Sequence, residues 1–346
     1  MKYEVAILKN ETATEHELWL RACEENSNVN ATIIDITKSH WLKEIQNKKY
    51  DLLLLKPPGR NSLFKQLYDE RIYILNGAID TPIYPSMDHV YIYENKRLLR
   101  DWLAAYKIPH PKTEVIFHKN EAEKFANKNS QNWIVAKTNI GASGNGVQIL
   151  KSKNEILNYI ENAFSTGVKA KSGPKLFKGK VLLKLKKATK KGFLKNRMKE
   201  YKAAASEVQK GFVIFQEFIP HEYEWRCVVF GDSYFAHKKL VKGEKSSGSL
   251  QKGYDEVPLK LLDFIKTICN RTGINSAAID VFEHNGGYLV NEIQCFFGQS
   301  DPYQMLIDDK PGRYRFIDDK WQFEEGMYNT NECYDLRLEH ALSLLK

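Results

Sequence analysis

The chain has 346 residues and a mass of 40.1 kDa, with 42% apolar and 27% charged residues, which is typical of a soluble globular protein with room for two or three domains. No apolar run approaches the roughly 20 residues that a membrane-spanning helix needs. Acidic residues lie near the amino terminus, where a signal peptide needs an apolar core. We therefore expect no membrane span and a cytoplasmic location.

The cysteine pattern argues against a disulfide framework and against a structural zinc site, because the count is odd and no pair has C-x-x-C spacing. Buried free thiols in a reducing cytosol are the expectation. The five cysteines are Cys23, Cys227, Cys269, Cys295 and Cys333.

The net charge of +9 is concentrated in one segment. Residues 169–210 hold 15 of the 52 basic residues and 2 of the 43 acidic ones, so this segment carries +13 and the rest of the chain −4. The segment is either a solvated lysine-rich insertion or a patch for an acidic partner, such as an anionic polymer, a nucleic acid or a phosphorylated substrate. Its few aromatic residues do not indicate base stacking.

The first ninety residues alternate strand and helix patterns, which favours a parallel sheet. The continuous apolar run in LLLL is typical of a strand that is covered on both faces. Predicted strands lie at 2–9, 30–36, 50–58 and 81–86, and predicted helices at 13–25, 40–48 and 62–75.

The remaining chain mixes helices with strands. A glycine ends the helix at 258–273, and Asn285-Gly286-Gly287 predicts a hairpin between two late strands. Predicted helices lie at 94–113, 120–129, 154–164, 258–273 and 334–345, and predicted strands at 113–117, 133–137, 147–150, 212–220, 223–232, 233–241, 276–284 and 288–296.

Residues 137–147, KTNIGASGNGV, place three glycines and a serine between two strand-like runs. By itself this stretch is typical of an ordinary small-residue hairpin. The alternative is a loop that covers a phosphate, because glycines without Cβ atoms let backbone N–H groups approach phosphate oxygens.

The two late strands carry oxygen ligands. A hairpin near Gly286 places Asp280 opposite Glu292, and Gln294 shares the face of Glu292 because side chains alternate along a strand. Hard oxygen ligands of this kind suit Mg²⁺. The alternative, a solvated polar sheet face, is disfavoured by apolar neighbours on both strands.

Taken in order, these motifs resemble the ATP-grasp superfamily: a lysine, a glycine-rich loop, a strand-end hinge and an acidic pair on late strands. The resemblance covers about residues 90–300. It implies an α/β (α+β ATP-grasp) fold with a parallel-sheet pre-ATP-grasp domain at 1–90. A small lobe with the basic insertion would follow at 91–215, and a C-terminal lobe with the metal site at 216–346.

The resemblance also implies roles for individual residues. Lysines and the glycine loop would bind the phosphates, the hinge would bind adenine, Glu224 the ribose hydroxyls, and Arg226 and Lys239 would stabilise the transferring phosphoryl group. Two positions depart from the family pattern, since Gln294 replaces the usual asparagine and Lys239 what is often arginine. The implied ATP-binding residues are Lys96, Lys137, Gly141, Ser143, Gly144, Gly146, Gln216, Glu217, Phe218, Ile219 and Glu224, and the implied Mg²⁺ ligands are Asp280, Glu292 and Gln294.

Substrate contacts are expected from two polar segments near these motifs. They are Lys245, Ser247 and Ser249 in one segment and Gln299 and Tyr303 in the other. No Ser-His-Asp or Cys-His arrangement is evident, and His221 and His237 fit structural roles better than catalysis.

The resemblance implies an ATP- and Mg²⁺-dependent carboxylate–amine ligase that forms an acyl phosphate, acting in peptide or surface-glycan modification. One alternative is an ATP-grasp kinase for a polyol or inositol phosphate. A second is a nucleotide-binding module that holds an anionic polymer. Many relatives form dimers, so a homodimer is one expectation. The sequence does not identify the acid or the amine.

Overall fold

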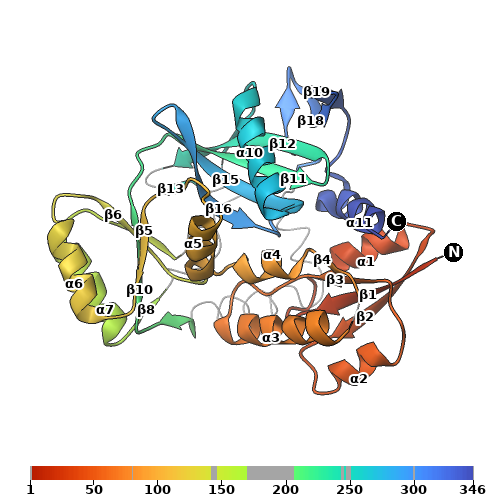
Figure 1. Cartoon of the computed structure of the whole chain (residues 1–346), viewed down its shortest axis with the longest axis horizontal. Helices are drawn as coiled ribbons and strands as arrows, with labels where there is room; N and C mark the ends of the chain where they lie inside the picture. The colour runs from red at the N-terminus through yellow and green to blue at the C-terminus, as the bar shows by residue number, and fades with distance from the viewer. Residues whose placement is uncertain are drawn as a thin grey trace, which may run out of the picture.

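The structure is a computed structural model that describes residues 2–79, 81–141, 146–169, 206–242, 245–246, 251–298 and 301–345. Its strands form a parallel sheet, two antiparallel sheets and one small two-stranded pair, with helices packed on the sheets (Figure 1). The expected α/β class with a parallel amino-terminal sheet is confirmed. Among the residues described, no helix is long and apolar enough to cross a membrane.

The amino-terminal sheet has the strand order β2-β1-β3-β4 and is parallel throughout. Its four leucines in β3 point alternately to two apolar clusters: Leu52 and Leu54 pack with one, Leu53 and Leu55 with the other. Both faces are therefore covered, as the uninterrupted apolar run predicted. The strands are β1 (Tyr3–Lys9), β2 (Val29–Asp35), β3 (Leu52–Leu55) and β4 (Ile83–Tyr84), and the helices are α1 (Glu17–Glu24), α2 (Trp41–Gln46), α3 (Ser62–Ala78) and α4 (Met87–Ile92).

The middle sheet is antiparallel with the order β5-β10-β6-β7. Two helices pack on it through a separate apolar cluster. The Ser152 side chain caps the second helix by accepting a hydrogen bond from the backbone N–H of Glu155. The strands are β5 (Thr113–Ile116), β6 (Ile134–Lys137), β7 (Val147–Leu150) and β10 (Val213–Glu217), the helices are α6 (Lys119–Lys128) and α7 (Lys153–Phe164), and β8 (Val168–Lys169) pairs with β9 (Val208–Gln209) beside them.

The large sheet has the core order β16-β15-β11-β12-β18-β17. Helices α5 (Lys96–Ala105) and α10 (Leu259–Thr272) share its apolar cluster, and α10 ends at Gly273, which has a positive φ of 73° as a helix stop requires. Its strands are β11 (Tyr223–Phe230), β12 (Ser233–Lys242), β13 (Lys245–Ser246), β14 (Lys252–Gly253), β15 (Ser276–His284), β16 (Gly287–Gln294), β17 (Leu306–Ile307), β18 (Lys310–Ile317) and β19 (Lys320–Glu325).

The predicted late hairpin is confirmed, with Asn285 and Gly286 both at positive φ, 50° and 73°. The pairing contains one irregularity: Asp280 lies opposite Glu292, but Val281 lies opposite Val290. Asn291 is therefore the extra residue of a β-bulge. This bulge decides the geometry of the site described below.

Several elements differ from the sequence prediction. The helix expected over 94–113 is α5 alone, which ends at Ala105, and α4, β17, β18 and β19 were not predicted. Strand β10 (Val213–Glu217) extends across the predicted boundary between the two lobes at residues 215 and 216. The carboxyl-terminal helix α11 (Tyr334–Ser343), which follows the short helix η1 (Thr330–Cys333), packs beside α1 on the amino-terminal sheet (Figure 1). The predicted domain boundaries stay a prediction, and most of the basic insertion (170–205) lies outside the described residues.

Candidate functional site

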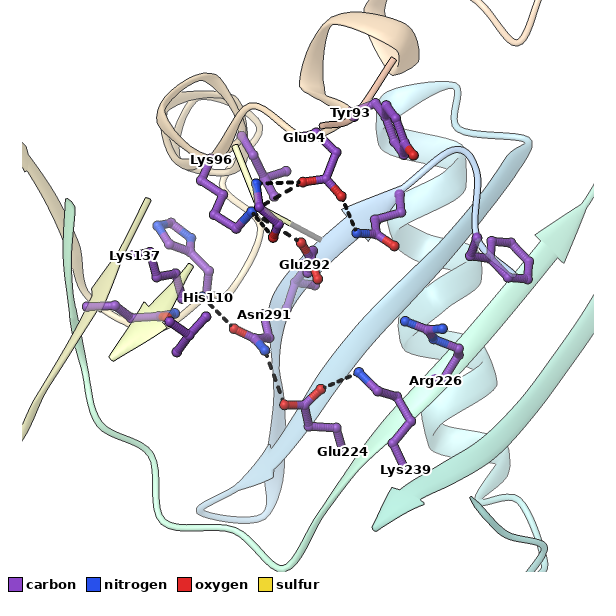
Figure 2. Close-up of a pocket in the computed structure, with 18 of the residues that line it drawn as sticks. Tyr93, Glu94, Lys96, His110, Lys137, Glu224, Arg226, Lys239, Asn291 and Glu292 are labelled. Carbon is purple, nitrogen blue, oxygen red and sulfur yellow. Dashed lines mark hydrogen bonds and ion pairs between the residues drawn. The ribbon is translucent and has the colours of Figure 1, made fainter. Parts of the chain in front are cut away.

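A cavity of about 640 Å³ lies between the amino-terminal, middle and large sheets. Loops of the amino-terminal sheet close one end, strands of the middle sheet form one wall, and the large sheet forms the other. Figure 2 shows that the charged side chains of this cavity point toward one another from separate elements. The predicted residues that line it are Lys96, Lys137, Gly141, Gln216, Glu217, Phe218, Ile219, Glu224, Arg226, Lys239, Glu292 and Gln294.

The register of the large sheet brings its charged residues together. Glu224 and Arg226 are two residues apart on β11 and so share a face. Lys239 on β12 lies opposite Glu224, and Asp280 on β15 lies opposite Arg226. Glu292 on β16 lies opposite Asp280, which extends the same row to a fourth strand.

Asp280 is the centre of a buried charge network. Its carboxylate accepts two hydrogen bonds of 2.9 Å from Arg226, through Nε and Nη2, and one of 2.7 Å from Lys239 Nζ. Lys239 also donates to Glu224 Oε2 at 2.8 Å. Burial raises the pKa of Asp280, but the two cations outweigh burial and hold it well below its usual value.

The bulge at Asn291 turns this side chain toward the cavity beside Glu292 (Figure 2). Asn291 accepts a hydrogen bond of 2.9 Å from Lys137 Nζ through Oδ1 and donates one of 3.3 Å to Glu224 Oε1. Lys137 is thereby connected to the Asp280 network through a neutral amide. Burial lowers the pKa of Lys137 to about 8, although Glu292 opposes this shift.

Lys96 at the start of α5 lies between two carboxylates. Its Nζ is 3.6 Å from Glu94 Oε2 and 3.7 Å from Glu292 Oε1, and it donates to the Gly141 carbonyl at 3.3 Å. Burial lowers the pKa of Lys96, but Glu94 and Glu292 outweigh burial and raise it above its ordinary value. Glu94 also accepts from the N–H of Gly141 and from Gln294 Nε2, so it joins α5, the start of the glycine loop and β16.

The expected metal ligands do not form a free carboxylate cluster. In the part of the chain that the structure describes, no group of three or more His, Cys, Asp or Glu side chains is arranged to hold a metal ion. Asp280 is neutralised by Arg226 and Lys239, and Glu292 faces Lys96. The protein's own cations therefore pair with these carboxylates in the structure, and their binding of Mg²⁺ stays a prediction.

The glycine segment is described only in part, while the hinge residues 216–219 all line the cavity. Gly141 lines the cavity, whereas Gly146 packs against Thr138, where an added Cβ would lie 1.8 Å from Oγ1. Ser143 and Gly144 lie outside the described residues. At the hinge, Glu217 accepts a 2.7 Å hydrogen bond from the Lys112 N–H, and the Phe218 ring lies 5.3 Å from that of Trp133.

Of the substrate residues predicted from sequence, Tyr303 is the one whose side chain the structure describes. Tyr303 stacks edge-on with Tyr254, at 5.5 Å between ring centroids, and is not among the lining residues. Ser247, Ser249 and Gln299 lie outside the described residues, and of Lys245 only the backbone in β13 is described. Their roles stay predictions.

The surroundings of His221, His237 and Cys295 near the cavity favour structural roles over catalytic ones. His237 is buried, and burial lowers its pKa to about 3. The ring of His221 lines the cavity and its Nδ1 lies 2.7 Å from the Ile219 carbonyl. Cys295 is a buried thiol whose pKa burial raises to about 12, which disfavours a nucleophilic thiolate.

Sequence reasoning missed two residues of this network. Asn291 lies directly before Glu292, but strict alternation along β16 assigns it to the opposite face, and only the bulge brings it inside. Glu94 adopts a positive φ of 49° immediately before the Asn95 cap of α5. In the sequence, its place two residues before the predicted phosphate-binding Lys96 was the feature that could have indicated a role in the site.

No protein-family model matches the sequence, and the search of curated proteins returned no significant match. Solved structures do match the fold. D-alanyl-alanine synthetase A from Vibrio cholerae O1 superposes with a TM-score of 0.56 at 13% identity, over 99% of this chain and 98% of that chain. A RimK domain protein described as ATP-grasp, from Sphaerobacter thermophilus, superposes with a TM-score of 0.52 at 16% identity, over 84% and 90% of the two chains.

The chain has the ATP-grasp fold. A third structure, D-alanine–D-alanine ligase from Bacillus anthracis complexed with ATP, has a TM-score of 0.51 at 12% identity and covers 99% of this chain and 98% of its own. At these identities the likeness concerns the fold, which the sequence motifs had predicted. The chemistry has to be argued from the residues of this chain.

Two adjacent lysines on β12 test the buried charge network. Lys239→Met keeps the apolar stem but leaves Glu224 and Asp280 without their shared ammonium, and we expect a loss of about 3 kcal/mol or more of unfolding free energy. Lys238→Met, on the opposite face, removes a pair with the exposed Asp255 and should cost about 1 kcal/mol or less. Urea unfolding of both variants measures the difference, and equal losses would contradict the network's importance.

Proposed function

We propose that the protein is an ATP- and Mg²⁺-dependent ligase that joins a carboxylate to an amine through an acyl phosphate. The observation that carries this proposal is the convergence of Lys96, Lys137, Arg226 and Lys239 on one cavity of an ATP-grasp fold. Such a set of cations suits the phosphates of ATP and the phosphoryl group in transfer.

Lys96 and Lys137 have weak partners in the structure, and a bound nucleotide would replace them. Lys96 is shared between Glu94 and Glu292 at 3.6 and 3.7 Å, distances longer than a normal charged hydrogen bond. Lys137 bonds to the neutral Asn291 rather than to a carboxylate. Phosphate oxygens would therefore offer both lysines stronger partners than they have in the structure.

The remaining walls suit the other parts of ATP. Gln216 and Ile219 at the hinge are buried, and the backbone around Glu217–Ile219 would bind the purine edge, with apolar side chains of β6, β7 and β10 packing on the ring. Glu224 would accept hydrogen bonds from the ribose hydroxyls. These roles follow the resemblance and fit the places that the residues occupy in the cavity.

The residues on β15 and β16 fit Mg²⁺ by donor chemistry. Glu292 and Gln294 carry hard oxygens on one strand, and Asp280 lies in register opposite Glu292. Bound phosphates would pair with Lys96 and Lys239, which now face these carboxylates, and would leave carboxylate oxygens available for the ion. When bound, the ion supplies charge neutralisation for the phosphates.

The proposed reaction needs no nucleophile from the protein. One carboxylate oxygen of the acid forms a bond to the γ-phosphorus of ATP, and the bond to the β-γ bridging oxygen breaks to release ADP. The amine nitrogen then forms a bond to the acyl carbon, loses a proton, and expels inorganic phosphate. Arg226 and Lys239 would stabilise the negative charge that develops on the phosphoryl oxygens.

The structures compared above include proteins whose names are ligases or synthetases, which supports this reaction class. Peptide or surface-glycan substrates, the kinase and polymer-binding alternatives, a homodimer and a cytoplasmic location stay predictions. The acidic partner of the lysine-rich segment also stays a prediction, because most of that segment lies outside the described residues.

An ATP-turnover screen of acids against amines tests the proposal. We expect ADP and phosphate in equal amounts only when both an acid and an amine are present, and Glu292→Gln should lower this rate by at least a hundredfold. Glu283→Gln is the matched control, because Glu283 accepts from Tyr223 outside the cavity. Phosphorylation of one acceptor without free phosphate would instead indicate a kinase.

The low pKa of Lys137 predicts a pH dependence of nucleotide binding. The lysine is protonated below its pKa of about 8 and neutral above it, and phosphates prefer the charged form. Affinity for a non-hydrolysable ATP analogue should therefore fall as pH rises from 7 to 9.5, measured by titration calorimetry. Lys137→Arg stays protonated and should bind with a flatter pH profile; identical profiles would contradict a phosphate contact at this residue.

A further inference from the structure

The end of the cavity at the amino-terminal sheet carries a lysine that the proposed reaction does not use. Lys56 directly follows β3, at the carboxyl edge of the parallel sheet, and lines the cavity. This edge is where open parallel sheets bind ligands. Glu15, Gly59 and Arg60 line the same end.

The backbone of Lys56 is held in place on both sides. Its N–H donates to the Tyr68 hydroxyl at 3.0 Å, and its carbonyl accepts from Asn10 Nδ2 at 2.8 Å. Both Tyr68 and Asn10 are buried. The base of this side chain is therefore pre-organised before any substrate arrives.

The ammonium group of Lys56 lies against aromatic rings instead of a carboxylate. Its Nζ is 4.4 Å from the ring centroid of Phe296 and 5.8 Å from that of Tyr93. Across the described residues, no acidic side chain lies within 4.0 Å of it, and Arg60 is the residue that pairs with Glu15, at 3.8 Å. Burial lowers the pKa of Lys56, while Glu15 opposes this shift. An ammonium group that lies against aromatic rings, with no described carboxylate at ion-pair distance, is stabilised when an anion pairs with it.

This lysine also lies close to the phosphate-binding part of the cavity. The loop that carries it turns at Gly59, where an added Cβ would lie 2.9 Å from Glu94 Cγ and 3.1 Å from the Tyr93 ring. Glu94 in turn contacts Lys96. The loop and Lys96 thus both approach the side chain of Glu94, and Lys56 and Lys96 line the same cavity.

We propose that Lys56 binds an anionic group, a carboxylate or a phosphate, of the substrate that is not ATP, and that the protein therefore acts on an acidic substrate. The anion recognised here is a group that does not itself react. The inference rests on the proposed function, since it places that second substrate in the same cavity. Phe296 and Tyr93 hold the ammonium toward the cavity, which selects a charged group over a neutral one.

Direct binding tests this site without requiring turnover. With a non-hydrolysable ATP analogue and Mg²⁺ at saturation, succinate and inorganic phosphate serve as the two probes and butyramide as the neutral one. We expect at least one anion to raise the Tm of the wild type by a few degrees at tens of millimolar. Lys56→Met should lose this shift, and butyramide should give none.

The control is Lys9→Met, which removes a lysine at the end of β1 on the same sheet edge but outside the cavity lining. It should keep the full shift. A shift with succinate alone identifies a carboxylate site, and one with phosphate alone a phosphate site. Equal shifts in the wild type and Lys56→Met, or none with either anion, overturn the proposal.

Kinetics separate this proposal from the proposed function. In the turnover screen, matched pairs such as aspartate with asparagine and phosphoserine with serine should differ. Lys56→Met should lower kcat/KM for the charged member by roughly ten- to a hundredfold, mainly through KM, with KM for ATP unchanged. Turnover that ignores the charge overturns the anion site alone, whereas anion binding without any acid- and amine-dependent ADP release overturns the ligase alone.

Discussion

The buried carboxylate of Asp280 is the constraint on which the rest of the site depends. It accepts three charged hydrogen bonds, two from Arg226 and one from Lys239, which also binds Glu224. An isolated buried carboxylate would cost several kcal/mol, and the observed register of strands β11, β12 and β15 avoids this cost because it places Arg226 and Lys239 beside Asp280. That register places Glu292 at the end of the same row. The alignment of the large sheet therefore brings all of these charged groups together.

The other two sheets and helix α5 add further lysines to the cavity that the large sheet lines on one side. Lys137 comes from the middle sheet and reaches the network through Asn291, while Lys96 begins the helix that packs on the large sheet. The amino-terminal sheet closes the far end with Lys56. Cations thus line the cavity from three directions, and two of them, Lys56 and Lys137, pair with no carboxylate at hydrogen-bonding distance among the residues described. An anionic nucleotide would give Lys137 a negatively charged partner, and an anionic second substrate would give one to Lys56.

Much of the fold could be read from local patterns, and the site only in part. The leucines of β3, the Asn285-Gly286 turn and the stop at Gly273 each have a strong local cause, and the structure has all three. In the structure, Lys96, Lys137 and the hinge line one cavity together with Glu224, Arg226, Lys239 and Glu292 of the large sheet. The inward turn of Asn291 depends on a bulge that alternation does not predict. The pairing of Asp280 with Arg226 depends on a contact between residues far apart in the sequence, and the sequence motifs did not predict it.

The most direct test of the ligase account follows an oxygen atom. The acid that supports turnover is labelled with ¹⁸O in its carboxyl group, and the released phosphate is analysed by mass spectrometry. An acyl phosphate leaves one carboxyl oxygen on the phosphate, so the account predicts one ¹⁸O in each phosphate released. Unlabelled phosphate formed together with ADP and the amide product would show that the carboxylate never received the phosphoryl group, and would contradict the account.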